Sequence, residues 1–200
     1  DIGAEVIISK SCWFLYDTSD VIISGFTFRE TPRGAIAVIG KCERNRFEYL
    51  HFQNCSSAPR TSCTLFFGGS GGNCNIVEYC VFERTADRVN TDGSLEKASI
   101  GLMISEGDRE REGRIKNHII RKNSFTNYNF AILVGTSGAV GNVFGHTIEY
   151  NLCRNCYDDG IRVKCSDTIV RGNILSRNTN SAISVLAGRG SIVQNNRVSD

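Results

Sequence analysis

One short stretch combines basic and acidic side chains at a spacing that could do chemistry. The segment CYDDGIRVKCSDTIVRGN, residues 156–173, places Asp158 and Asp159 before a strand pattern that contains Arg162 and Lys164. If the apolar residues of that strand point inward, the arginine and the lysine share its outer face. A neighbouring arginine is expected to lower the pKa of the lysine, which suits a general base. The alternative is an ordinary solvated strand face.

Oxygen-bearing side chains lie close to these charges in the sequence. The carboxylates of Asp158 and Asp159 and the amides of Asn127 and Asn129, one repeat earlier, are oxygen ligands of the kind that calcium prefers. We therefore expect calcium near the acidic pair, with Asn127 as a further candidate ligand and both asparagines as candidate substrate contacts. His146 opens the repeat before the lysine and is another candidate to line a groove.

The elements that must position these residues belong to an internal repeat. The segments NHIIRKNSF, HTIEYNLC, DTIVRGNIL and SIVQNNRV share a polar residue, a β-branched pair and then an asparagine. The aligned asparagines are Asn123, Asn151, Asn173 and Asn196, which lie 28, 22 and 23 residues apart. NIVEYCVF, NRFEYLHF and DVIISGFTF continue the pattern upstream and bring it to seven repeats.

Each repeat also carries a second apolar strand with alternating side chains, such as AILVGTS, GIRVKCS and AISVLAG. A unit of about 22 residues cannot bury its apolar side alone, so stacked coils must close a common core. The sequence therefore predicts an all-β protein: one right-handed parallel β-helix domain over residues 1–200, with about seven coils and loop insertions. Asparagine suits a fixed turn because it tolerates left-handed backbone and its amide can bond to the next copy.

Alignment of the second strands by their inward apolar pairs places the basic residues on one coil. The outward column through the lysine reads Gly135, Lys164, Leu186, and the column through the arginine reads Leu133, Arg162, Ser184. Insertions at residues 83–98, 106–114 and 135–145 exceed the repeat length and are expected to leave the coil as loops that wall a groove.

Composition limits the classes of partner. The formal net charge of +2 is too small to favour nucleic acid, and no apolar run is long enough to span a bilayer. The nine cysteines form no zinc pattern and are read as small core residues, with disulfides in a secreted protein as the alternative. The chain shows no polar caps, so we expect an excerpt of a longer protein, with flanking domains or self-association through uncapped ends.

The quoted segments together carry a resemblance to a known family. GTSG, HTIEYNLCRNC, DDGIRVKCSDTIVRGN and AISVLAGRGSIVQNN, in this order, resemble polysaccharide lyase family 6, the group of chondroitinase B and alginate lyases. The resemblance is best over residues 117–200 and looser over residues 20–82. It implies a secreted, extracellular or periplasmic enzyme that cleaves an acidic, uronic-acid-containing polysaccharide by β-elimination.

The resemblance also implies roles for particular residues. Lys164 falls on the general base, Asp159 on an acidic calcium position, and Asn127 or Asn129 near an asparagine ligand. The second acidic position falls on Tyr157, which we place among the substrate-binding residues. The assisting arginine of the family is expected one coil after the lysine, where this chain has Leu186. Arg162 or Arg189 is predicted to take over that role.

Other functions remain open on the sequence alone. A β-helix that binds glycan without cutting it, or a structural segment of a surface, adhesion or filament protein, fits the missing column arginine and caps. Uronate epimerisation begins with the same proton removal. A hydrolase of the polygalacturonase type is the lesser alternative: NTDG at residues 90–93 lies far from the acidic pair, and alternation would send Asp158 and Asp159 to opposite faces.

Overall fold

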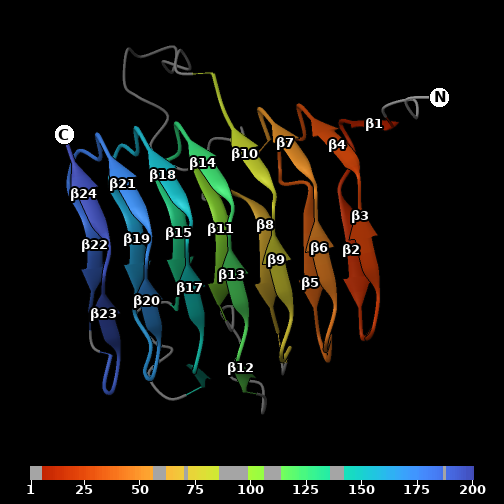
Figure 1. The fold of residues 1–200 in the computed structure, drawn as a ribbon. Helices are drawn as coiled ribbons and strands as arrows, with labels where there is room; N and C mark the ends of the chain where they lie inside the picture. Colours follow the sequence, from red (N-terminus) through yellow and green to blue (C-terminus); the bar gives the residue numbers. More distant parts are fainter. Residues whose placement is uncertain are drawn as a thin grey trace.

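Short parallel strands make up the regular structure of the described residues. The computed structural model describes residues 6–55, 62–69, 72–85, 99–105, 114–135, 142–186 and 188–200. Every regular element in these ranges is a β-strand, and each strand pairs with the equivalent strand of the next coil. Figure 1 shows the coils side by side, from the N-terminal coil in red to the C-terminal coil in blue.

The strands form three long sheets, which we name A, B and C. Sheet A contains β1 (Val6–Ser9), β4 (Phe26–Arg29), β7 (His51–Gln53), β10 (Val81–Glu83), β14 (Ser124–Thr126), β18 (Leu152–Arg154), β21 (Ile174–Ser176) and β24 (Arg197–Ser199). Sheet B contains β2 (Trp13–Tyr16), β5 (Ile36–Ile39), β8 (Ser62–Gly68), β11 (Ser99–Ser105), β15 (Phe130–Val134), β19 (Asp159–Val163) and β22 (Ser181–Val185). Sheet C contains β3 (Ile22–Ser24), β6 (Arg46–Glu48), β9 (Ile76–Glu78), β13 (Ile119–Arg121), β17 (Thr147–Glu149), β20 (Ile169–Arg171) and β23 (Ile192–Gln194). The pair β12 (Ile115–Lys116) and β16 (Val143–Phe144) forms a small fourth sheet.

The chain visits the three sheets in the order A, B, C and then begins the next coil. Sheets B and C have 7 strands and sheet A has 8, which gives seven coils and one extra strand of sheet A. This count confirms the sequence prediction of a parallel β-helix with about seven coils. The predicted repeat corresponds to a strand of sheet C, a tight corner and the following strand of sheet A.

Inward side chains of all three sheets fill the interior of the coil stack. In sheet A the central residue of successive strands is a stacked phenylalanine: Phe28, Phe52, Phe82 and Phe125, with ring centroids 5.3, 4.6 and 4.4 Å apart. Each of these rings is fully buried, so each contributes roughly 1.5–3 kcal/mol of apolar burial. Six of the nine cysteines are also buried and all nine are free, which confirms the core reading for those six.

A ladder of asparagines holds the corner between sheets C and A. The backbone N–H of Asn123 donates to Oδ1 of Asn151, that of Asn151 to Asn173, and that of Asn173 to Asn196. The predicted contact between copies is therefore confirmed. The predicted backbone geometry is wrong by one residue: the left-handed residue comes just before the asparagine, as at Tyr150, where φ is 55°. The asparagine side chain bonds across coils while its neighbour makes the turn.

Candidate functional site

The outer face of sheet B carries the residues predicted to do chemistry. β19 pairs in register with β15 and β22, so Leu133, Arg162 and Ser184 form one outward column, as the sequence predicted. Lys164 follows β19 directly, and its backbone N–H donates to the carbonyl of Val134 at 2.7 Å. Its side chain is partly exposed.

Gly135 keeps the neighbouring position in the lysine column free of a side chain. Its φ is +79°, and a Cβ there would lie 2.6 Å from the carbonyl oxygen of Lys164. On the other side of the column stands Leu186, which is 47% exposed. Among the described residues the ammonium of Lys164 makes no hydrogen bond or ion pair. The lysine is thus positioned by the backbone and remains free to contact a ligand.

Arg162, two residues earlier on the same face, is held in place from three directions. Its Nε donates to Asp159 Oδ2 at 2.5 Å, and its Nη2 donates to Asp158 Oδ1 at 3.1 Å. The guanidinium lies over the ring of Phe130, with Cζ 4.5 Å from the centroid. Asn180 Nδ2 donates to both carboxylates, at 2.9 and 3.1 Å. The two hydrogen bonds use two of the five guanidinium N–H groups.

An interruption of strict alternation explains why both acidic residues reach the arginine. A Cβ on Gly160 would lie 2.7 Å from Leu175 Cδ2 in the core, so position 160 faces inward. Ile161 is also fully buried. Two consecutive inward positions put Asp159 on the same side as Arg162, and the expectation that the acidic pair points to opposite faces is wrong. The Asp159 side chain is 0% exposed and that of Asp158 is 30% exposed.

The arrangement of the acidic pair does not fit a calcium ion. Three carboxylate oxygens accept hydrogen bonds from Arg162 or Asn180, and the guanidinium occupies the position where a cation would bind. The acidic pair already has a cation, since both carboxylates bind the guanidinium of Arg162. Within the described ranges no group of three or more His, Cys, Asp or Glu residues converges as a metal cluster. Calcium binding stays a prediction that would require the arginine to leave.

Asn127 and Asn129 serve the corner between sheets A and B. Asn127 has a φ of 62°, donates from Nδ2 to the carbonyl of Arg84 at 2.6 Å and accepts from Asn155 at 3.3 Å. Both ends of its amide are therefore used by the coil, which argues against its role as a metal ligand. Asn129 is 9% exposed, and its carbonyl accepts the backbone N–H of Asp158 at 3.0 Å. Its contribution is to place the acidic pair.

His146 does not line a groove. It is fully buried, and its Nδ1 accepts the backbone N–H of His118 on the preceding coil at 3.2 Å. The two imidazole rings stack with centroids 5.3 Å apart. Because no part of the His146 side chain reaches the surface, its assignment to substrate binding is wrong. It belongs to a second ladder, just before the strands of sheet C, in which Asn75 holds the equivalent position and its Oδ1 accepts the N–H of Asn45.

The remaining predicted residues lie near the column without joining it. Tyr157 is partly exposed, and its backbone N–H donates to the carbonyl of Tyr128. Arg189 is exposed in the turn after β22, where its carbonyl accepts the N–H of Asp167. Most of the three predicted insertions, including NTDG at residues 90–93, lies outside the described residues. Each insertion adjoins a strand of sheet B at one end, since β11 begins at Ser99 and ends at Ser105, and β15 ends at Val134.

Asp158, Asp159, Phe130 and Asn180 surround Arg162, and we call this group the arginine clamp. Sequence reasoning missed two of its members, Phe130 and Asn180. Phe130 aligns with Asp159 two positions before the paired Ile132 and Ile161, so the register of neighbouring coils could have found it. Asn180 lies one coil later, 22 residues after Asp158. The repeat length gives that spacing, but the contact depends on the interruption of alternation at Gly160, which the neighbouring coils share at Gly101 and Ala131.

Comparison with known proteins addresses the fold. The family described as "Right handed beta helix region" matches residues 106–200. Two solved structures that the chain resembles are endopolygalacturonase I from Stereum purpureum, complexed with two galacturonate, and GH136 lacto-N-biosidase from Eubacterium ramulus. The polygalacturonase is 11% identical, the match covers 100% of this chain and 79% of that chain, and the TM-score is 0.42. The lacto-N-biosidase is 9% identical, the match covers 100% of this chain and 54% of that chain, and the TM-score is 0.36. A comparison with curated proteins found no match.

The described part of the chain contains no helix long and apolar enough to cross a membrane. Its three parallel sheets, the order in which the chain visits them and the matched region agree on the architecture. The protein is a right-handed parallel β-helix.

Proposed function

We propose that the outer face of sheet B binds an acidic, uronic-acid-containing polysaccharide and that the protein cleaves it by β-elimination. The observation that carries the proposal is the pairing of a fixed arginine with a free lysine. Arg162 is immobilised by Asp158, Asp159 and Phe130, whereas Lys164 has no partner among the described residues. The guanidinium of Arg162 suits binding of a substrate carboxylate, and the amine of Lys164 suits proton transfer.

In this reaction Lys164, as the neutral amine, takes the proton from the carbon next to the substrate carboxylate. The electrons of that C–H bond form a double bond to the adjacent carbon, and the bond from that carbon to the bridging oxygen breaks. The leaving oxygen takes up a proton from water, and the protonated Lys164 later returns its proton to solvent. The unused N–H groups of Arg162 hold the substrate carboxylate, which makes the neighbouring proton more acidic. Arg189 is the second arginine proposed to steady the leaving oxygen.

Hydrolysis by the acidic pair is less well supported. An inverting hydrolase needs one carboxylic acid and one carboxylate about 6.5–9.5 Å apart across the sugar. Here Asp158 and Asp159 bind the same guanidinium and the same amide, which draws them together and leaves Asp159 without exposure. Lys164 is the better candidate for proton transfer because no described residue pairs with it and its side chain is partly exposed. An extracellular location follows from the proposed substrate.

The test follows the ultraviolet absorbance of the unsaturated uronate during incubation with alginate and with dermatan sulfate. The native protein should produce a signal, and Lys164→Ala should reduce its rate by at least about 100-fold, since general base catalysis typically contributes 10²–10⁴-fold. Lys41→Ala, which removes an exposed lysine at the end of another coil, is the matched control and should keep the full rate. Equal rates for Lys164→Ala and the native protein would refute the proposal.

Leu186 supports a second candidate, a glycan-binding β-helix without catalysis, because it occupies the position expected for the assisting arginine. The same proteins distinguish the two functions. A flat absorbance trace together with binding that is lost in Lys164→Ala would favour the binding protein. A flat trace without binding would leave neither function supported.

A further inference from the structure

A second surface lies at the corner between sheets C and A, away from the outer face of sheet B. One residue per coil makes this corner with a left-handed backbone: Gly25, Tyr49, Tyr79, Lys122, Tyr150, Gly172 and Asn195. Glycine and asparagine adopt this geometry easily, whereas a bulky side chain is strained there. Three tyrosines in such a column therefore need an explanation beyond the turn itself.

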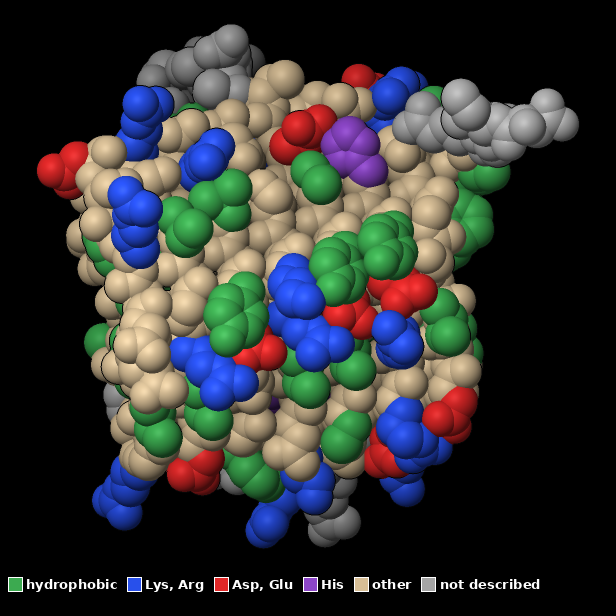
Figure 2. Space-filling model, viewed as in Figure 1, with side chains coloured by type: hydrophobic (Ala, Val, Ile, Leu, Met, Phe, Trp, Pro, Cys, Tyr) green, Lys and Arg blue, Asp and Glu red, His purple; other side chains and the backbone are tan. Residues whose placement is uncertain are grey.

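Burial does not explain the tyrosines. Tyr49, Tyr79 and Tyr150 are 60%, 40% and 56% exposed. Each thus places a large, partly apolar ring in solvent at a turn that glycine or asparagine makes on other coils. The face shown in Figure 2 carries exposed hydrophobic side chains with Lys and Arg side chains beside them.

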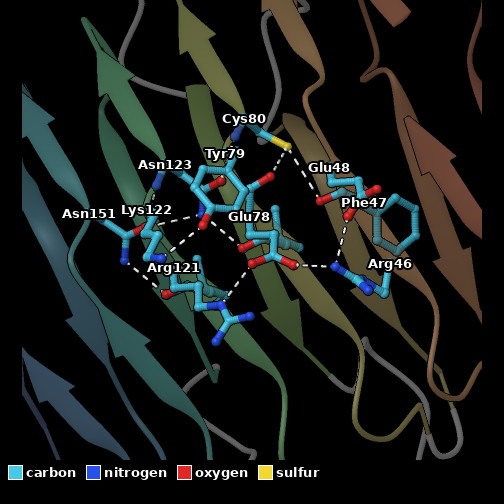
Figure 3. Close-up of polar contacts among 12 residues, drawn as sticks. Arg46, Phe47, Glu48, Glu78, Tyr79, Cys80, Arg121, Lys122, Asn123 and Asn151 are labelled. Atoms are coloured by element: carbon cyan, nitrogen blue, oxygen red, sulfur yellow. Dashed lines mark hydrogen bonds and ion pairs between the residues drawn. The ribbon is translucent and has the colours of Figure 1, made fainter. Parts of the chain in front are cut away.

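The tyrosines and a lysine form a continuous series along the coils. Tyr49 and Tyr79 stack with centroids 5.2 Å apart and an interplanar angle of 5°. On the next coil Lys122 Nζ lies 5.0 Å from the Tyr79 centroid and donates to its hydroxyl at 2.8 Å. Figure 3 shows Lys122 reaching over Tyr79 above the charged residues of sheet C. One coil further, Tyr150 covers Gly172, whose added Cβ would lie 2.6 Å from Cε1 of the ring.

Below this series the arginine side chains are exposed, whereas the glutamate side chains that pair with them are buried. Glu78 accepts from Arg46 and Arg121 at 2.8 Å each, and Glu149 accepts from Arg171 at 2.7 Å. The glutamate side chains are 2% and 9% exposed, whereas the arginine side chains are 45%, 34% and 43% exposed. A ligand would therefore meet guanidinium groups, with their counter-charges underneath.

We propose that this ridge, defined as Tyr49, Tyr79, Lys122, Tyr150, Arg121 and Arg171, is a binding site for an acidic polysaccharide chain lying along the axis of the β-helix. The site goes beyond the catalytic proposal for sheet B and does not depend on it. Exposed tyrosine edges and hydroxyls offer apolar contact and hydrogen bonds to sugar rings. Cations recur on coils spaced by about 4.8 Å, the distance between neighbouring strands, and meet the acidic groups of the chain.

Charge density favours a glycan over a nucleic acid. The four cations Arg46, Arg121, Lys122 and Arg171 face the three anions Glu48, Glu78 and Glu149, a local net charge of +1. Nucleic acids carry a denser charge and select more strongly basic surfaces. Bases also need open aromatic faces for stacking, whereas the facing rings of Tyr49 and Tyr79 already occupy each other. A polymer with sparser charges and many hydroxyls fits the ridge better.

Variants to asparagine separate binding from folding, because Asn195 already makes this turn in the same column. Tyr150→Asn and Lys122→Asn should keep the denaturation midpoint of the parent. Arg177→Asn is the matched control: it removes an exposed cation with a φ of 53° from the corner between sheets A and B. All three are made in Lys164→Ala, so that turnover does not consume the probe.

Titration with a dermatan sulfate oligosaccharide should show binding about tenfold weaker for each ridge variant, a loss on the order of one aromatic or cation contact. The control should bind within twofold of the parent, and neutral dextran should not bind. Unchanged affinity in both ridge variants would overturn the proposal. So would an equal loss in the control, or a single-stranded oligonucleotide that binds as tightly with the same dependence on the ridge. If the two ridge variants lose the same affinity for the oligosaccharide when position 164 is again lysine, the two surfaces act independently.

Discussion

The two buried histidines make the stability of the protein depend on acid. Burial lowers the pKa of His146 to about 3, and burial together with the adjacent His146 lowers the pKa of His118 well below its usual value. Each Nδ1 accepts a backbone N–H of the preceding coil, so the folded state requires the neutral rings. Each Nε2 is buried without a hydrogen-bond partner among the described residues.

The size of the effect follows from linkage between protonation and folding. The unfolded chain protonates its histidines below a pH of about 6.5, whereas the folded chain does not, so stability is complete above that pH and falls as the pH falls further. For a folded pKa of about 3, the loss at pH 4.5 is about 2.7 kcal/mol. The lowered pKa of His118 adds to this loss in the same direction.

The test variant is His146→Asn. Asparagine suits this position because Asn45 and Asn75 accept the equivalent backbone N–H in the ladder that contains His146. Urea denaturation at pH 7 and pH 4.5 gives the loss of unfolding free energy for each protein. The variant should lose about 2.7 kcal/mol less than the native protein, and the double variant with His118→Asn should lose less still. An identical loss in all three proteins would refute the assignment of acid sensitivity to these rings.

Three further predictions concern the site and the coil. Asp159→Asn leaves Arg162 without its buried anion and should cost about 3 kcal/mol of unfolding free energy in urea, with weaker glycan binding; native-like stability would contradict the clamp. EDTA should leave glycan binding and elimination unchanged, because the guanidinium takes the place of a metal. A loss of activity in EDTA that added calcium restores would contradict this. Asn151→Ala should cost about 2–3 kcal/mol, more than Asn196→Ala on the last coil, and equal thermal midpoints for the two variants would count against the ladder.

The repetitive part of the fold was predictable from the sequence. Equivalent strands such as those around Ile161 and Ile183 repeat their apolar alternation, and stacking then fixes their register. The asparagine ladder followed from a column of identical residues. The position of the left-handed residue did not, because Tyr150 and Lys122 have no intrinsic preference for that geometry and the stack imposes it.

The candidate site was predictable in location and less so in detail. The outward placement of Arg162 and Lys164 follows from alternation, and the structure confirms the arginine column. The convergence of Asp158 and Asp159 on that arginine depends on two consecutive inward positions, which period-two reasoning excludes. His146 was misplaced because a polar residue at a corner can point into the core when it bonds to the preceding coil. The resemblance to family 6 lyases stays a prediction.

The proposed transfer of a proton to Lys164 is tested most directly by proton NMR of alginate oligosaccharides incubated with the protein in D₂O. The account predicts a new vinyl proton from the unsaturated product with the native protein and none with Lys164→Ala. Deuterium incorporated next to the carboxylate without cleavage would indicate epimerisation instead. New reducing ends without a vinyl proton, or a vinyl proton that persists in Lys164→Ala, would contradict the account.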